Sequence, residues 1–149
     1  MQPSSRLFVY GTLLFAELRA LVAGRSLEAR EAVLPGYRRR ALRNAAYPGV
    51  VRAPGESTPG LLLEAVDAQA LARIDRFEGS LYARRRLSVR IVGRPGFVHA
   101  AVYVVPPARR GVLADAAWDP RAFAEAHLAG YLEACGAIGR AEARRLRGA

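Results

Sequence analysis

Glu78 lies in the stretch ARIDRFEGSLYARRR (residues 72–86) and is the candidate of this chain for acid–base chemistry. The apolar residues Leu71 and Ile74 precede it by seven and four positions. At about 100° per residue, all three would share one stripe of a helix. A helix that turns its apolar side to the core would turn this carboxylate inward too. Because desolvation raises the pKa of a carboxyl, Glu78 would be a usable proton acceptor near neutral pH.

A second candidate is the segment Tyr10-Gly11-Thr12-Leu13, where a short apolar run ends in Gly-Thr. Glycine permits backbone conformations in which consecutive N–H groups turn the same way. Such a loop can hold a carboxylate or a developing oxyanion. Structural roles are the alternatives: Glu78 could end a frayed helix and turn to water or pair with Arg84, and Gly11 could simply end a strand.

Other common catalytic arrangements are missing from the sequence. A single cysteine, Cys135, and two distant histidines, His99 and His127, lack the spacing of a zinc site, so we expect no metal. Neither a Walker loop, a GxGxxG motif nor a G-x-S-x-G elbow occurs. We interpret both histidines as surface or hydrogen-bonded core residues.

The elements that would position the two candidates are mostly strands. Apolar runs and turn residues predict strands at 7–10, 29–34, 37–42, 50–51, 60–66, 82–92 and 98–105. Helical spacing predicts helices at 14–23, at 68–77 with Asp67 as N-cap, and from Pro120 toward Cys135, where Gly136 and Gly139 would interrupt the helix. Hairpin-type turns outnumber βαβ units. An α+β protein with a mixed or antiparallel sheet, closed into a small barrel, is therefore expected.

The totals fit one globular domain over residues 1–149, with an arginine-rich tail from about residue 139 that forms a short helix or no fixed structure. No apolar run approaches the roughly 18–20 residues that span a bilayer, and the N-terminus lacks the charged region of a signal peptide. A lone cysteine cannot form an internal disulfide, so a cytoplasmic protein is expected. The oligomeric state is left open.

The net charge of +10 raises the possibility of nucleic-acid binding. All 23 basic residues are arginines, however, and the chain is also rich in alanine, as a coding bias would produce. The arginine runs are short and are not interleaved with aromatic residues. We interpret them as solvated surface; the competing hypothesis of a nucleic-acid binder predicts steeply salt-dependent binding.

Taken in order, several motifs resemble the gamma-glutamyl cyclotransferase-like family. They cover most of the chain: Phe8-Val9-Tyr10-Gly11-Thr12-Leu13, Leu34-Pro35-Gly36-Tyr37, Tyr47-Pro48-Gly49, Gly60-Leu61-Leu62, Ile74-Asp75-x-Phe77-Glu78-Gly79-x-x-Tyr82-x-Arg84 and Ala101-Val102-Tyr103. YGTL alone would be a weak signal, but YGTL together with FEG-x-x-Y-x-R at this separation is fairly specific.

The resemblance implies a small mixed, largely antiparallel β-barrel with two or three flanking helices and a pocket at one end. Known members convert a γ-glutamyl group to 5-oxoproline and release the attached amine or amino acid, without metal or cofactor. By this resemblance, Tyr10, Gly11, Thr12 and Leu13 would bind the α-carboxylate and the amide region of a γ-glutamyl substrate, and Glu78 would accept the proton.

Tyr82 is expected to line the same pocket, and Tyr103 is a further candidate. After YGTL the chain continues LFAELRALVAGR, whereas members acting on γ-glutamylamines often have a more polar, glycine-containing stretch there. The leaving amine is therefore left open. The alternative function is a non-catalytic module that binds a small carboxylate in the same pocket.

Overall fold

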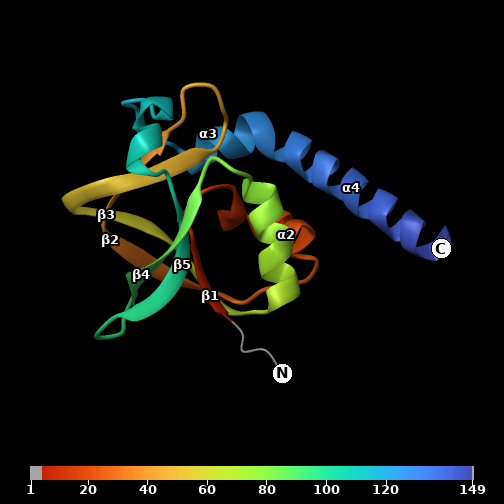
Figure 1. The fold of residues 1–149 in the computed structure, drawn as a ribbon, viewed down its shortest axis with the longest axis horizontal. Helices are drawn as coiled ribbons and strands as arrows, with labels where there is room; N and C mark the ends of the chain where they lie inside the picture. Colours follow the sequence, from red (N-terminus) through yellow and green to blue (C-terminus); the bar gives the residue numbers. More distant parts are fainter. Residues whose placement is uncertain (1–4, 149) are drawn as a thin grey trace.

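In the computed structural model, which describes residues 5–148 and the side chains of residues 5–138, five strands form a closed barrel (Figure 1). The strands are β1 (Ser5–Val9), β2 (Ala29–Ala41), β3 (Pro48–Val66), β4 (Ala83–Ile91) and β5 (Val98–Val104), in the spatial order β1-β3-β2-β4-β5. Only β1 and β5 are parallel to each other; all other neighbouring strands are antiparallel. The predicted mixed, largely antiparallel barrel is confirmed.

Helical segments flank the barrel. They are α1 (Ala16–Ala23), α2 (Ala68–Glu78), α3 (Pro120–Phe123) and α4 (Ala129–Gly148), together with the short turns η1 (Thr12–Leu14), η2 (Pro107–Val112) and the π-helical η3 (Ala124–Leu128). Within the described part of the chain, no helix has both the length and the apolarity that a membrane crossing requires.

The barrel has fewer and longer strands than the sequence predicts. The expected break at Pro35-Gly36 and the expected loop at 55–59 are both wrong, because β2 and β3 continue through them. The pairing register shifts between Pro35 and Tyr37. Gly36 and Gly55 have φ values of +83° and +85°, which glycine adopts at little cost. The hairpin therefore bends at these glycines, and its strands continue instead of ending there.

Helix α2 is fixed against the outer face of the barrel. Alternation along β1 places Phe8 in the barrel core, and Leu7 in a second cluster outside it, where Leu7 packs with Ile74 of α2. The side chain of Asp67 accepts a hydrogen bond from the Ala70 N–H at 2.8 Å, which confirms the predicted N-cap. Because Ile74 is fully buried, the residue one turn later on the same stripe, Glu78, points toward the barrel end.

The C-terminal helices begin as predicted, at the N-cap Asp119 and Pro120. The predicted interruption at Gly136 and Gly139 is wrong, since α4 continues to Gly148 and extends away from the barrel (Figure 1). Glycine keeps its N–H and costs only about 1 kcal/mol in a helix, and the surrounding alanines, arginines and leucine favour helix strongly. The side chains of the arginine-rich tail lie outside the described residues.

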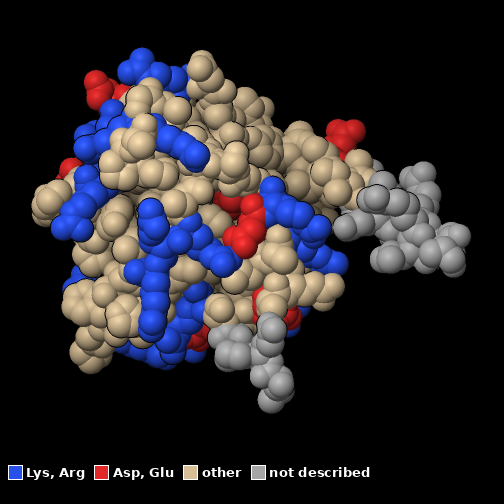
Figure 2. Space-filling view, viewed as in Figure 1, with Lys and Arg blue, Asp and Glu red and all other residues tan. Residues whose placement is uncertain are grey.

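Exposed arginines gather over β4 and β5 on the face shown in Figure 2. Arg84, Arg86 and Arg90 alternate along β4 and are all exposed. On the other face of the strand, Val89 lies in the barrel core, whereas Arg85 is exposed. The interpretation of this charge as solvated surface stays a prediction.

Candidate active site

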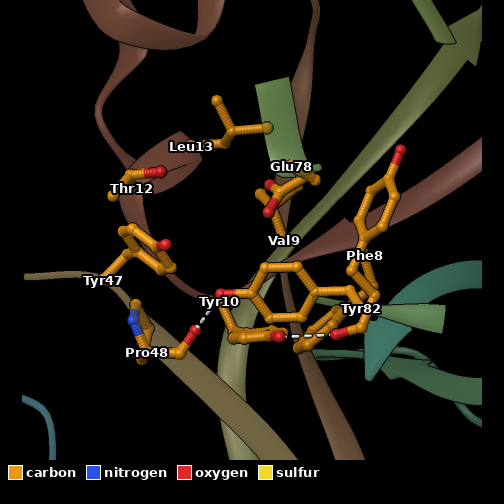
Figure 3. Close-up of a pocket in the computed structure, with 11 residues that line it drawn as sticks. Phe8, Val9, Tyr10, Thr12, Leu13, Tyr47, Pro48, Glu78 and Tyr82 are labelled. Carbon is orange, nitrogen blue, oxygen red and sulfur yellow. Dashed lines mark hydrogen bonds between the residues drawn. The ribbon is translucent and has the colours of Figure 1, made fainter. Parts of the chain in front are cut away.

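A hollow at one end of the barrel contains Glu78 and the YGTL segment together (Figure 3). The space between atoms at this hollow is about 320 Å³ when the open solvent at its mouth is counted with it. Each site residue expected from the sequence lines this hollow: Tyr10, Gly11, Thr12, Leu13, Glu78 and Tyr82. Phe8, Val9, Tyr47, Pro48 and Tyr103 complete the wall. The roles of these residues stay predictions, but the structure brings all of them to one place.

Glu78 is the last residue of α2 and faces the hollow across from Thr12 and Leu13 (Figure 3). Burial raises the pKa of the Glu78 carboxyl to about 8, and the nearby charge of Asp75 contributes to this rise. Among the described residues, no side chain or backbone group forms a hydrogen bond or ion pair with this carboxylate. Gly79 has a φ of +76° and ends the helix, so the carboxylate is left at the helix end.

Pairing of Glu78 with Arg84, one alternative considered from the sequence, is wrong. Arg84 instead places its Nη1 atom 2.7 Å from Oδ2 of Asp75. The other carboxylate oxygen of Asp75, Oδ1, accepts a hydrogen bond from the Tyr103 hydroxyl at 2.5 Å. Sequence reasoning assigned Asp75 no role. Its position three residues before Glu78, a spacing that places side chains side by side on a helix, was the available signal.

The YGTL segment forms a tight turn over the hollow. The Leu14 N–H donates to the Gly11 carbonyl at 3.0 Å, which closes the turn. A Cβ atom at Gly11 would lie 2.9 Å from the Pro48 ring, so only glycine fits this approach. Within residues 5–148, the N–H groups of Gly11, Thr12 and Leu13 have no acceptor. The three residues line the hollow, and a buried N–H group without an acceptor requires a partner such as a ligand or water.

Three tyrosines fix the walls of the hollow. The Tyr82 hydroxyl donates to the Pro48 carbonyl at 2.6 Å, and the Tyr10 hydroxyl donates to the Tyr103 carbonyl at 2.5 Å. Burial raises the pKa of Tyr10, Tyr82 and Tyr103 above the ordinary value of a phenol. All three therefore stay neutral at physiological pH, and Glu78 is the ionisable group of the lining with a pKa near neutrality.

The arrangement brings a carboxyl of raised pKa and N–H groups without acceptors among the described residues to the lining of one hollow. The donors can hold an anionic or polarised oxygen, and the carboxylate can take a proton from a group held beside it. Over the described residues, no three His, Cys, Asp or Glu side chains come together closely enough to hold a metal ion.

Comparison with known proteins finds relatives over most of the chain. The sequence model of the family described as gamma-glutamyl cyclotransferase, AIG2-like, matches residues 7–120. Protein AIG2 C of Arabidopsis thaliana is 31% identical over 86 residues, which are 58% of this chain and 52% of that protein. AIG2-like protein D of the same plant is 28% identical over 82 residues, 55% of this chain and 54% of that protein. The chain thus matches about half the length of these curated relatives.

Solved structures share the fold. A solution structure of an Arabidopsis thaliana protein has a TM-score of 0.67 and 25% identity, covering 93% of this chain and 83% of that one. A structure titled gamma-glutamyl cyclotransferase has a TM-score of 0.60 and 16% identity, covering 90% and 87%. An AIG2-like protein of Mus musculus has a TM-score of 0.55 and 23% identity, covering 79% and 90%. The latter two likenesses, below 25% identity, concern the fold alone.

Proposed function

The chain belongs to the AIG2-like gamma-glutamyl cyclotransferase family, as its motifs predict, and on this premise we propose that it converts a γ-glutamyl amide or γ-glutamyl amino acid to 5-oxoproline and a free amine. The observation that carries the proposal is that Glu78 lines the same hollow as Gly11, Thr12 and Leu13, whose N–H groups, like the Glu78 carboxylate, have no partner among the described residues.

The reaction begins at the α-nitrogen of the substrate. Glu78 accepts a proton from the α-ammonium group, and the resulting amine attacks the γ-carbonyl carbon of the same molecule. A new C–N bond closes a five-membered ring, and the bond to the leaving nitrogen then breaks. Two protons pass from the α-nitrogen to the leaving nitrogen overall, and Glu78 carries them in turn. No water is consumed.

The pKa of Glu78 suits this role. With a pKa of about 8, Glu78 is a stronger base than an ordinary carboxylate and is closer in proton affinity to an amine. At pH 7 about a tenth of the free protein would carry the ionised form. The positive charge of a bound α-ammonium group would lower the pKa of Glu78 and increase that fraction.

The YGTL segment would hold the rest of the substrate. Its free N–H groups would bind the α-carboxylate and the region of the γ-amide, so that the glutamyl chain is bent with its nitrogen near its carbonyl. Such positioning contributes much of the acceleration of an intramolecular reaction. The neutral phenols of Tyr10 and Tyr82 would shape the hollow without competing for the substrate's charge.

The test is 5-oxoproline formation, measured by mass spectrometry, with a panel of γ-glutamyl amides and γ-glutamyl amino acids. Glu78→Gln keeps the size of the side chain and removes the base, so we expect turnover to fall by about 10²-fold or more. Glu56→Gln is the matched control, because Glu56 is exposed and lies outside the hollow. Tight binding of panel members without turnover would instead favour the non-catalytic carboxylate-binding module.

A further inference from the structure

Two arginines from different elements donate hydrogen bonds to backbone carbonyls at the two ends of the YGTL turn. Arg39 of β2 donates through Nη1 to the Tyr10 carbonyl at 2.8 Å. Arg19 of α1 donates through Nη1 to the carbonyls of Leu13 at 3.1 Å and Leu14 at 3.4 Å. Arg19 is 8% exposed, so its guanidinium is committed to this contact.

Neither guanidinium is neutralised by direct pairing. No carboxylate of the described residues lies within 4 Å of Arg19 or Arg39. Arg39 packs 5.3 Å from the ring centroid of Trp118, and Asp119 acts on it only through space. Burial lowers the pKa of both arginines from its very high ordinary value. An arginine remains charged in a protein all the same, so two positive charges lie beside the turn.

A peptide group is planar, so a hydrogen bond that fixes its C=O also fixes the direction of its N–H. Because C=O and N–H of one peptide group point opposite ways, holding the Tyr10 carbonyl fixes the direction of the Gly11 N–H. In the same way, Arg19 holds the peptide between Leu13 and Leu14. The N–H of that peptide donates to the Gly11 carbonyl at 3.0 Å, which fixes the Thr12 N–H. Arg39 thus fixes the direction of the Gly11 N–H, and Arg19 fixes the direction of the Thr12 N–H.

We propose that Arg19 and Arg39 are positioning residues that make the YGTL turn selective for a substrate with a free α-carboxylate. A cation on the carbonyl side polarises each peptide and strengthens its N–H as a donor to an anion. The two guanidinium charges also favour a negative group at the turn without touching it. This inference rests on the proposed function and assigns the preference of the turn for a free α-carboxylate to these two arginines: analogues in which that carboxylate is esterified or absent would be poor substrates.

The first arm of the test assays the full chain with two substrates. One is a γ-glutamyl amide, and the other is the 4-aminobutanoyl amide of the same amine, which differs only in lacking the α-carboxylate. For Arg39→Met and Arg19→Met we expect kcat/KM on the γ-glutamyl amide to fall about tenfold, mainly through KM. The 4-aminobutanoyl amide, which can meet these N–H groups only through its amide, should lose several-fold less, and lysine at either position should restore part of the loss. Equal losses on both substrates would overturn the proposal.

Arg38→Met is the matched control, because Arg38 is the exposed neighbour of Arg39 and lies near Glu56 instead of the turn. It should leave both kinetic values unchanged. A loss as large as that of Arg39→Met would show that charge anywhere on β2 suffices, and would overturn the assignment.

The second arm does not depend on turnover. 5-Oxoproline, which carries the same carboxylate, is titrated while the amide NMR signals of Gly11 and Thr12 are followed. We expect these signals to move in the unsubstituted protein and in Arg38→Met, and to need about tenfold more ligand in Arg39→Met and Arg19→Met. Equal titrations in all variants would overturn the proposal even if the protein is an active enzyme. Failure of turnover alone, with the expected titrations, would overturn only the enzymatic function.

Discussion

Replacing Glu78 with glutamine should stabilise the folded protein, and the gain should depend on pH. The pKa of Glu78 rises from an ordinary 4.5 in the unfolded chain to about 8 in the folded protein. Between these two values the folded state binds a proton that the unfolded state has lost. Stability therefore decreases as pH rises through this window. Below about pH 4.5 the Glu78 carboxyl is protonated in both the folded and the unfolded state, so it does not lower the free energy of unfolding.

The size of the effect follows from the shift. Each pKa unit corresponds to about 1.4 kcal/mol, so the full shift sets a ceiling of roughly 4–5 kcal/mol above pH 8. Because the side chain keeps some contact with solvent at the mouth of the hollow, about 2–3 kcal/mol is the reasonable expectation. For a chain of this length, that amounts to roughly 6–10 °C in Tm.

Urea denaturation of the unsubstituted protein, Glu78→Gln and the control Glu56→Gln at pH 5, 7 and 9 measures the effect. The other titrating groups are shared, so they cancel in the difference between the unsubstituted protein and each variant. We expect the advantage of Glu78→Gln to be small at pH 5 and to grow to its full value at pH 9. The control should show no such trend. An advantage that stays constant with pH would refute the claim that burial raises the pKa of Glu78.

Three further predictions concern the surroundings of Glu78. Asp75→Asn removes a charge that raises the pKa of Glu78, so the pH midpoint of kcat/KM should decrease; an unchanged midpoint would contradict this. Gly11→Ala brings a Cβ atom to 2.9 Å from Pro48, which should cost about 1–3 kcal/mol in urea denaturation and reduce turnover more than tenfold. Tyr82→Phe removes the 2.6 Å hydrogen bond to the Pro48 carbonyl and should cost about 1–2 kcal/mol, by the same denaturation measurement; full stability would show that water replaces the hydroxyl.

The sequence was sufficient to predict the parts of the fold that depend on local pattern. Asp67 and Gly79 mark the ends of α2, and the helical phase of Leu71 and Ile74 indicates the direction of Glu78. Strand continuity was predicted less well. Pro35-Gly36 reads as a turn, but a glycine with positive φ can equally bend a long hairpin, and only pairing with the neighbouring strand decides between them.

Sequence patterns could not predict the contacts between elements that lie far apart in the chain. Arg84 lies near both Asp75 and Glu78 in the sequence, but it forms its ion pair with Asp75. The same carboxylate accepts a hydrogen bond from the Tyr103 hydroxyl of β5, a contact that the sequence near Arg84 does not indicate. The contacts of Arg19 and Arg39 with the YGTL turn join α1, β2 and the end of β1. In a chain whose 23 basic residues are all arginine, nothing in the residue type distinguishes these two from the exposed ones.

The central claim is that Glu78 is the base of a γ-glutamyl cyclisation. The most direct test measures kcat/KM for 5-oxoproline formation from pH 6 to pH 9, for the unsubstituted protein and for Glu78→Gln. The quantity to compare is the ratio of the two kcat/KM values at each pH. With a pKa of about 8, the ratio should increase nearly tenfold from pH 6 to pH 7 and level off above pH 8. A ratio close to one at every pH, with both proteins folded and active, would contradict the claim.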